Sequence, residues 1–238
     1  MKFIFLLIMF VNSIFAKQIV VGVGLSLAPY VFPQNDSGIE LDILREALKE
    51  ESNDTISVKY LPLLRIPFAL TTKKIDAATT INENSGLKNV FYSDTHIVYQ
   101  NVIVSLKSKN LHISKISDLQ NLKVIGFQNA KKYLGIEYKN IIPKMKYYQE
   151  LASQMLQVKL LFAKRVDAIA LDINIFKYIR KNLKDVNASQ RVNISSVFGK
   201  TYYKVAFVDK DTCDIFNKGL KKIKQSGRYK EIFDKYIK

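Results

Sequence analysis

The stretch that decides the fold is residues 75–94, IDAATTINENSGLKNVFYSD. It begins as a short buried strand and becomes polar and loop-like from Thr79 to Lys88. This change predicts Thr, Asn and Ser side chains, together with free backbone N–H groups, at the carboxyl end of a strand. Open α/β sheets bind small polar ligands at that edge. We therefore expect a ligand-binding rim here.

A second stretch repeats the same pattern later in the chain. Residues 167–172, DAIALD, form a buried apolar run that ends in the carboxylate of Asp172. Because both stretches place polar groups at the end of a buried strand, we predict that the two rims face each other across a cleft.

The first part of the chain alternates strands and helices. Strands are predicted at residues 18–24, 56–61 and 76–79, and helices at 39–51 and 63–73. The helix at 39–51 rests on apolar residues at 39, 43, 44, 47 and 48, which is the spacing of one helical face. This β-α-β-α-β order predicts a parallel sheet covered by helices.

The pattern starts again after a long strand at residues 97–106 and a polar tract at 107–117. The second unit has predicted strands at 122–127, 145–148 and 167–171, and predicted helices at 130–134, 149–164 and 173–183. Strands at 192–198 and 202–208 follow, separated by Gly199, and the chain ends in helical apolar stripes. The sequence therefore predicts two α/β units without visible sequence repetition.

The final apolar stripes need a surface to cover, and the simplest geometry returns the chain to the first unit. Residues 105–109 and 200–204 are the two predicted crossings, and two crossings make a hinge. We expect one lobe from residues 17–106 and 202–238, and a second lobe from residues 107–201. The predicted fold class is α/β, with two lobes and parallel-rich sheets.

Composition limits the classes of function. The chain has 238 residues and a formal net charge of +16, with its lysines scattered along the sequence. Scattered cations favour a basic, solvated surface over a nucleic-acid-binding patch. Cys213 is the single cysteine, so no internal disulfide is expected. His96 and His112 have no clustered partners, and we predict neither a metal nor a cofactor.

Residues 1–16 resemble a secretory signal peptide. Lys2 precedes a short apolar run, and the small residue Ala16 stands at the expected exit. The run is short for a membrane span, which needs about 20 residues; an uncleaved anchor is the alternative. No cysteine follows for attachment of a lipid, so we predict an exported protein without a lipid anchor.

Several short motifs occur in an order that is typical of one known family. They are Ala28-Pro29-Tyr30, residues 38–44 (GIELDIL), Tyr92-Ser93-Asp94, residues 165–168 (RVDA) and residues 227–236 (GRYKEIFDKY). With them the chain resembles the periplasmic solute-binding proteins of ABC importers, in the family that binds amino acids and other small polar solutes. The resemblance covers nearly all of the chain after residue 16. It implies the two-lobed fold of periplasmic binding proteins of type II.

The resemblance also implies ligand contacts. An acidic residue at the position of Asp172 commonly holds the α-ammonium group of the ligand; the alternative is that Asp172 caps the helix that begins at Ile173. The loop after the third strand usually supplies hydroxyl and N–H groups, and Thr79, Thr80, Asn82 and Ser85 stand there. The stacking aromatic residue of the family falls on Leu27, with Tyr30 close by.

One expected residue is missing. Family members usually carry an arginine in the loop after the third strand to bind the ligand carboxylate, but the aligned position falls on Ser85 or Gly86. We take Arg65, Lys131 and Lys88, in that order, as substitutes; the alternative for each taken singly is a solvated surface cation, which is the ordinary place of Arg and Lys.

Three functions remain open on these grounds. The first is a monomeric periplasmic protein that closes on a small polar solute and passes it to the membrane permease of an ABC importer. The second is a ligand sensor that partners a membrane signalling receptor. The third is a dehydratase-like enzyme with Glu83 as its general acid. Because an exported protein is kept apart from the nucleic acids of the cell, we predict no nucleic-acid partner. The sequence does not name the ligand.

Overall fold

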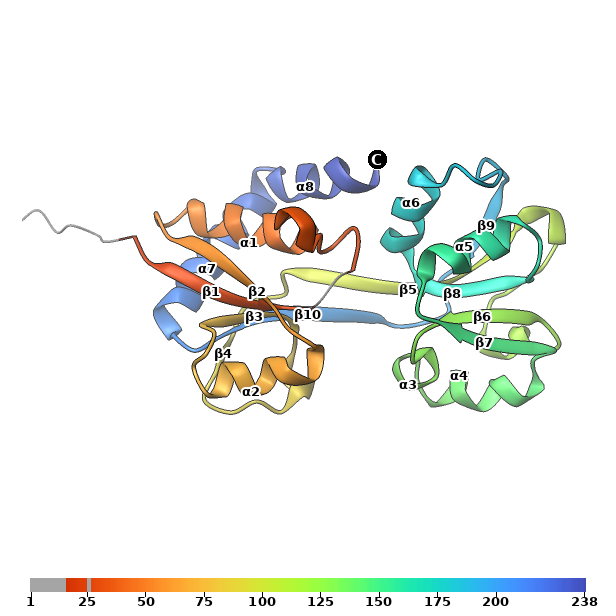
Figure 1. Cartoon of the computed structure of the whole chain (residues 1–238), viewed down its shortest axis with the longest axis horizontal. Coiled ribbons are helices and arrows are strands. Elements are labelled where there is room, and N and C mark those ends of the chain that lie inside the picture. The colour runs from red at the N-terminus through yellow and green to blue at the C-terminus, as the bar shows by residue number, and fades with distance from the viewer. Residues whose placement is uncertain (1–15, 25–26) are drawn as a thin grey trace, which may run out of the picture.

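The computed structural model describes residues 16–24 and 27–238. Apart from Ala16, the predicted signal peptide lies outside the described residues, and so do residues 25 and 26. Figure 1 shows two lobes, side by side, joined by the strands β5 (Ile97–Leu106) and β10 (Lys200–Phe207).

Lobe 1 holds a sheet with the order β2-β1-β3-β10. Besides β10, its strands are β1 (Gln18–Val23), β2 (Thr55–Tyr60), β3 (Ala77–Ile81) and β4 (Phe91–Tyr92). Its helices are α1 (Ile39–Lys49), α2 (Ile66–Thr71), α7 (Lys210–Gln225) and α8 (Arg228–Ile237). The pairs β1–β2 and β1–β3 are parallel, as the β-α-β-α-β order predicts, and β10 joins β3 in the antiparallel sense. In Figure 1, α1, α7 and α8 cover one face of this sheet and α2 covers the other.

Lobe 2 repeats the arrangement around a parallel core. Its elements are β6 (Lys123–Phe127), β7 (Tyr147–Leu151), β8 (Ala168–Asp172), β9 (Val192–Ser195), α3 (Ala130–Tyr133), α4 (Ile136–Ile141), α5 (Gln154–Phe162) and α6 (Ile173–Asn182). Strand β6 lies between β7 and β8 and is parallel to both, whereas β8 and β9 pair with β5 in the antiparallel sense. Short 3-10 helices occupy Pro33–Asn35, Leu63–Arg65, Glu83–Ser85, Lys107–Lys109, Ile116–Leu119 and Ile142–Lys144.

The hinge is formed by continuous strands. Residues Ile97 to Gln100 of β5 pair with β10, and from Asn101 onward β5 pairs with β8. The first crossing therefore lies near Gln100, not at residues 105–109, because the strand continues through the hinge instead of ending before it. The second predicted crossing, at residues 200–204, falls within β10. The division of the chain into lobe residues stays a prediction.

One other predicted element differs from the structure, and one helix of the structure was not predicted. Residues 149–151 are not the start of a helix, because Tyr147–Leu151 pairs with β6 as the edge strand β7. Pairing with a neighbouring strand overrides a helical spacing of apolar residues. Helix α4 was not predicted. It is a short segment bounded by Gly135 and Pro143, and it buries only Tyr138 and Ile141.

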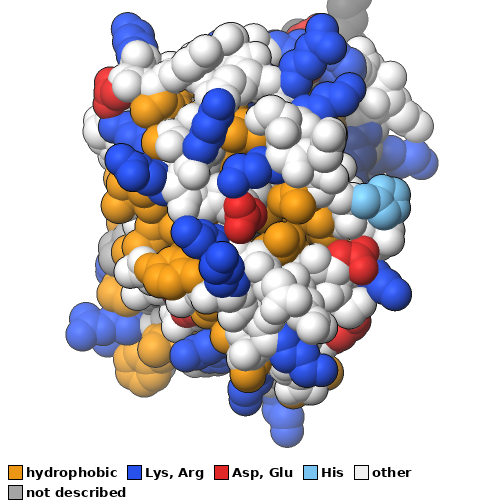
Figure 2. All heavy atoms as spheres, turned by 90° about the vertical axis from the view of Figure 1, so that its right-hand side faces the viewer, with side chains coloured by type: hydrophobic (Ala, Val, Ile, Leu, Met, Phe, Trp, Pro, Cys, Tyr) orange, Lys and Arg blue, Asp and Glu red, His pale blue; other side chains and the backbone are white. Residues whose placement is uncertain are grey.

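The charged residues are spread over the surface. Figure 2 shows the outer end of lobe 2, where Lys and Arg side chains are dispersed among neutral and apolar ones. Within the described residues, no helix combines the length and the apolar character that crossing a membrane requires.

The buried thiol of Cys213 leads to a first prediction. Cys213 lies in α7 and is 3% exposed. Burial, with a smaller contribution from Asp214, raises the pKa of this thiol to about 11. Because the thiolate is the reactive form, we expect a thiol reagent at pH 8 to modify the folded protein at least about tenfold more slowly than the protein in urea. Equal rates would contradict the buried position.

Candidate functional site

The two predicted rims approach the hinge from opposite lobes. Strand β3 ends at Ile81, which pairs with Lys204 of β10, and β8 ends at Asp172, which pairs with Asn101 of β5. Both carboxyl ends therefore lie against the two strands that connect the lobes. This is the edge at which α/β sheets bind ligands.

Asp172 is almost fully buried, with 3% of its surface exposed. Its Oδ1 accepts hydrogen bonds from the backbone N–H groups of Asn174 (2.8 Å) and Ile175 (3.1 Å), so it caps α6. Its Oδ2 accepts one from the N–H of Gln100 at 2.9 Å. Burial outweighs these hydrogen bonds and raises the pKa of the carboxyl group. From the described residues Oδ2 accepts this one hydrogen bond, and a carboxylate oxygen can accept a second. The ligand role of Asp172 stays a prediction.

Tyr30 contacts the same carboxylate from lobe 1. Its hydroxyl donates to Asp172 Oδ1 at 2.8 Å and accepts from Asn174 Nδ2 at 3.1 Å. Its fully buried ring stacks on Tyr99, with 4.1 Å between the ring centroids. Tyr30 thus joins the loop after β1 to the start of α6, and its ring face is already covered by another part of the chain.

The end of β3 has an unusual backbone. Thr80 has a φ of +58°, a left-handed conformation that is a genuine outlier for a β-branched residue. The pairing between β3 and β10 shifts register at this point, which is typical of a β-bulge. Thr80 Oγ1 donates to Glu40 Oε2 at 2.7 Å, and the buried Thr79 Oγ1 lies 3.4 Å from Thr80 Oγ1.

Glu40 is the central residue that sequence reasoning missed. It lies in the first turn of α1 with none of its surface exposed, and it also accepts from the hydroxyl of Tyr99 at 2.8 Å. His96 Nε2 lies 3.8 Å from its Oε2. Burial opposes the ionised form, but the nearby ring of His96 and the hydrogen bonds from Thr80 and Tyr99 together outweigh it and lower the pKa of Glu40. The spacing of Glu40 from residues 43, 44 and 47 places it on the apolar face of α1. An acid on that face is the feature of the sequence from which its burial could have been predicted.

A second prediction concerns pH. Because the pKa of Glu40 is lower in the folded than in the unfolded protein, its ionisation stabilises the folded state above the unfolded pKa of 4.5. That contribution is lost as the pH falls below 4.5 through the folded pKa. We expect the difference in unfolding free energy between wild type and Glu40→Gln to shrink from pH 6 to pH 3. Denaturation in urea at each pH measures it, and a difference that grows towards acid would contradict it.

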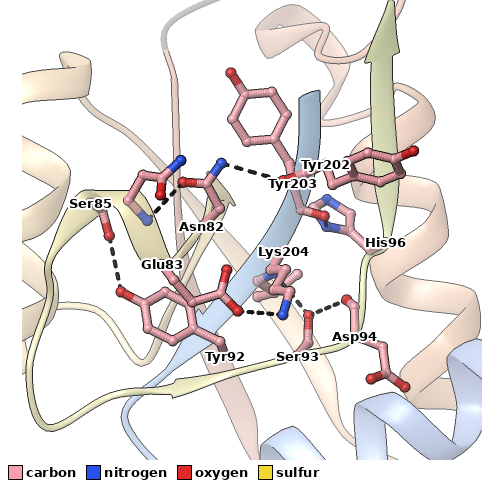
Figure 3. Close-up of polar contacts among 12 residues, drawn as sticks. Asn82, Glu83, Ser85, Tyr92, Ser93, Asp94, His96, Tyr202, Tyr203 and Lys204 are labelled. Carbon is pink, nitrogen blue, oxygen red and sulfur yellow. Dashed lines mark hydrogen bonds and ion pairs between the residues drawn. The ribbon is translucent and has the colours of Figure 1, made fainter. Parts of the chain in front are cut away.

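The loop after β3 is fastened to lobe 1 (Figure 3). Asn82 Nδ2 donates to the backbone oxygen of Tyr202 at 3.3 Å, and Ser85 Oγ lies 3.0 Å from the hydroxyl of Tyr92. Glu83 forms an ion pair with Lys204 of β10. The hydrogen bond from Lys204 lowers the pKa of Glu83, which is the opposite of what a general acid needs. The side chains of Asn82 and Ser85 hold the loop, and their contact with a ligand stays a prediction.

The proposed substitute cations lie at the surface. Arg65 ends the 3-10 helix before α2, and Lys88 and Lys131 are likewise exposed. The backbone N–H groups of Asn129 and Lys131, at the start of α3, donate to the carboxylate of Glu150 at 2.9 Å each. A carboxylate of the chain itself therefore already accepts from these N–H groups at the start of α3. In the part of the chain that is described, no cluster of His, Cys, Asp or Glu could hold a metal ion.

Comparison with known proteins decides the family. Residues 19–238 match the family of bacterial extracellular solute-binding proteins, family 3. The chain belongs to this family. Its members bind solutes, so solute binding is the function of this protein, and the sequence-based prediction of the family and of its role is confirmed.

Two curated relatives carry specific names. A probable histidine-binding protein of Campylobacter jejuni subsp. jejuni serotype O:2 is 26% identical over 223 residues, which cover 91% of this chain and 83% of the relative. An arginine-binding periplasmic protein of Mannheimia haemolytica is 25% identical over 208 residues, covering 84% and 81%.

Solved structures confirm the fold of this family 3 protein. An ancestral cationic amino acid solute-binding protein superposes with a TM-score of 0.72 at 22% identity, over 93% of this chain and 96% of that one. A histidine kinase sensor domain similar to periplasmic binding proteins gives 0.66 at 17% identity, over 93% and 96%. At these identities the likeness establishes the two-lobed α/β fold of type II and not the ligand.

Proposed function

We propose that the protein is a periplasmic binding protein that takes up an amino acid or a related small polar solute between its lobes. It would then deliver the solute to the membrane permease of an ABC importer. The observation that carries this proposal is the family match over residues 19–238, together with the polar ends of β3 and β8 at one hinge. Hinged lobes can close around a small ligand and shield it from water.

The ligand class follows from the relatives and from the charges near the hinge. The two curated relatives are named for histidine and arginine. In this chain the carboxylate of Asp172 lies at the end of β8, and the loop after β3 carries no arginine. A cationic amino acid, or an amine without a carboxylate, fits this charge distribution better than an acidic one.

Isothermal titration calorimetry tests the proposal. The panel holds L-arginine, L-lysine, L-histidine, L-glutamine, L-glutamate, and the amines agmatine and histamine. We expect at least one cationic member to bind with micromolar or tighter affinity, and L-glutamate not to bind. If the folded protein binds no member of the panel, the proposed ligand class is wrong.

We also propose that the protein is not an enzyme. The dehydratase alternative needed Glu83 as a general acid, and the ion pair with Lys204 holds Glu83 in its ionised form. Incubation with prephenate or arogenate is expected to give no product above that of buffer alone. Turnover that disappears in Glu83→Gln would overturn this part of the proposal.

A further inference from the structure

A line of contacts runs from the end of β3 to the start of α6. Thr80 donates to Glu40, Tyr99 donates to the other oxygen of Glu40, Tyr99 stacks on Tyr30, and Tyr30 donates to Asp172. Glu40, in the first turn of α1, is the one acid in this line that holds the β3 end. The proposed function gives Glu40 no role of its own.

The buried charge of Glu40 depends on the groups around it. It is fully buried, and an ionised buried group is costly unless hydrogen bonds and opposite charge compensate for it. The nearby ring of His96 has its Nδ1 3.2 Å from the backbone oxygen of Tyr203, so Nδ1 carries a proton. Among the described residues its Nε2 has no hydrogen-bond partner, and it lies 3.8 Å from Glu40 Oε2. A fully buried acid beside such an imidazole nitrogen departs from the usual rules of core packing, and such departures are expected at functional sites.

The backbone of Thr80, which Glu40 holds, is strained. Thr80 is a β-branched residue with a φ of +58°, a region that glycine enters freely and threonine does not. The side-chain hydroxyl of Thr80 is tied to Glu40 at 2.7 Å, and this bond favours the left-handed conformation. If Thr80 relaxed to an ordinary strand conformation, the peptide groups that follow it at the end of β3 would turn.

We propose that Glu40 is a positioning residue of the ligand site: it holds Thr80 in the left-handed conformation so that the end of β3 presents its backbone groups to the ligand. This inference rests on the proposed function. Glu40 itself need not touch the ligand, because it is fully buried and acts through Thr80.

A double-mutant cycle tests the inference by binding. The variants are Glu40→Gln, Thr80→Gly and the two combined, with L-arginine and L-histidine as probes. Glu40→Gln is expected to weaken binding at least tenfold. Thr80→Gly enters the left-handed conformation without help, so adding Glu40→Gln to it should weaken binding by less than about twofold relative to Thr80→Gly alone. A tenfold loss on adding Glu40→Gln to Thr80→Gly would overturn the inference.

A matched control separates charge from position. Glu50→Gln changes the same residue type at the exposed carboxyl end of α1. It is expected to leave binding within twofold of wild type. Equal losses in Glu50→Gln and Glu40→Gln would show that net charge is the cause, and the inference would fail.

A second readout does not depend on the ligand. Hydrogen exchange at residues 79–82 is followed by mass spectrometry. It should be at least tenfold faster in Glu40→Gln than in wild type or Glu50→Gln. In the Thr80→Gly background, adding Glu40→Gln should not change the exchange rate. Should Glu40→Gln not fold, Thr80→Val removes the same hydrogen bond from the other side and should give the same faster exchange. Unchanged exchange in Thr80→Val overturns the inference. If neither probe binds wild type while exchange behaves as expected, the assignment of the probes fails and the role of Glu40 stands.

Discussion

Replacement of Gly219 by alanine is expected to lower the free energy of unfolding by about 3 kcal/mol. Gly219 lies in α7, where that helix packs against α1. A Cβ atom at this position would lie 1.7 Å from the backbone oxygen of Ala47 and 2.7 Å from its carbonyl carbon. The clash is with the backbone of α1, so the two helices must separate to relieve it.

The expected loss of stability is opposite in sign to the ordinary effect of this substitution in a helix. Alanine in a helix interior is intrinsically more favourable than glycine by about 1 kcal/mol, so a helix free of contacts would gain stability. Urea denaturation measures the change. Gly199→Ala is the control, because a Cβ there meets no atom of the described part of the chain within 4 Å, and it should change stability little. A Gly219→Ala protein as stable as wild type would contradict the close packing of α1 and α7.

The second large effect is expected for Asp172→Ala, which should destabilise the protein by about 2–4 kcal/mol. The change removes the cap of α6, worth about 1 kcal/mol. It also leaves the buried hydroxyl of Tyr30 and the N–H of Gln100 without their acceptor, and each unsatisfied buried group costs about 1–3 kcal/mol. The expected total is smaller than the sum of these costs, because water or Asn174 can replace the lost carboxylate as an acceptor.

Two comparisons interpret the result. Asp209 caps α7 by accepting from Thr212, a residue of the same helix, so Asp209→Ala should cost only about 1 kcal/mol. Asp172→Asn keeps an oxygen for the cap and should cost less than Asp172→Ala, while it removes the charge that the ligand role needs. Urea denaturation and calorimetric titration measure stability and binding separately. If Asp172→Ala costs no more than Asp209→Ala, the contacts with Tyr30 and Gln100 contribute nothing.

The contacts of several candidate site residues could not be predicted from the sequence. Asp172 was predicted to bind the ligand or to cap α6, and the cap is present with 3% of the residue exposed. Tyr30 was expected near the ligand, but its ring is covered by Tyr99. Glu40 was missed, since an acid in the first turn of a helix reads as an ordinary charge for the helix dipole. Its partners Thr80 and Tyr99 are 40 and 59 residues away along the chain.

Apart from α4 and the strand at Tyr147–Leu151, the sequence alone determined the order of strands and helices, the two-lobed α/β class and the lack of the family arginine, because these depend on short-range spacing and on aligned motifs. The tertiary structure alone decided that β5 crosses the hinge near Gln100, that Thr80 is left-handed and that Tyr30 meets Asp172 across 142 residues of chain. Contacts between distant segments depend on how the lobes pack, and no local pattern of residues records that.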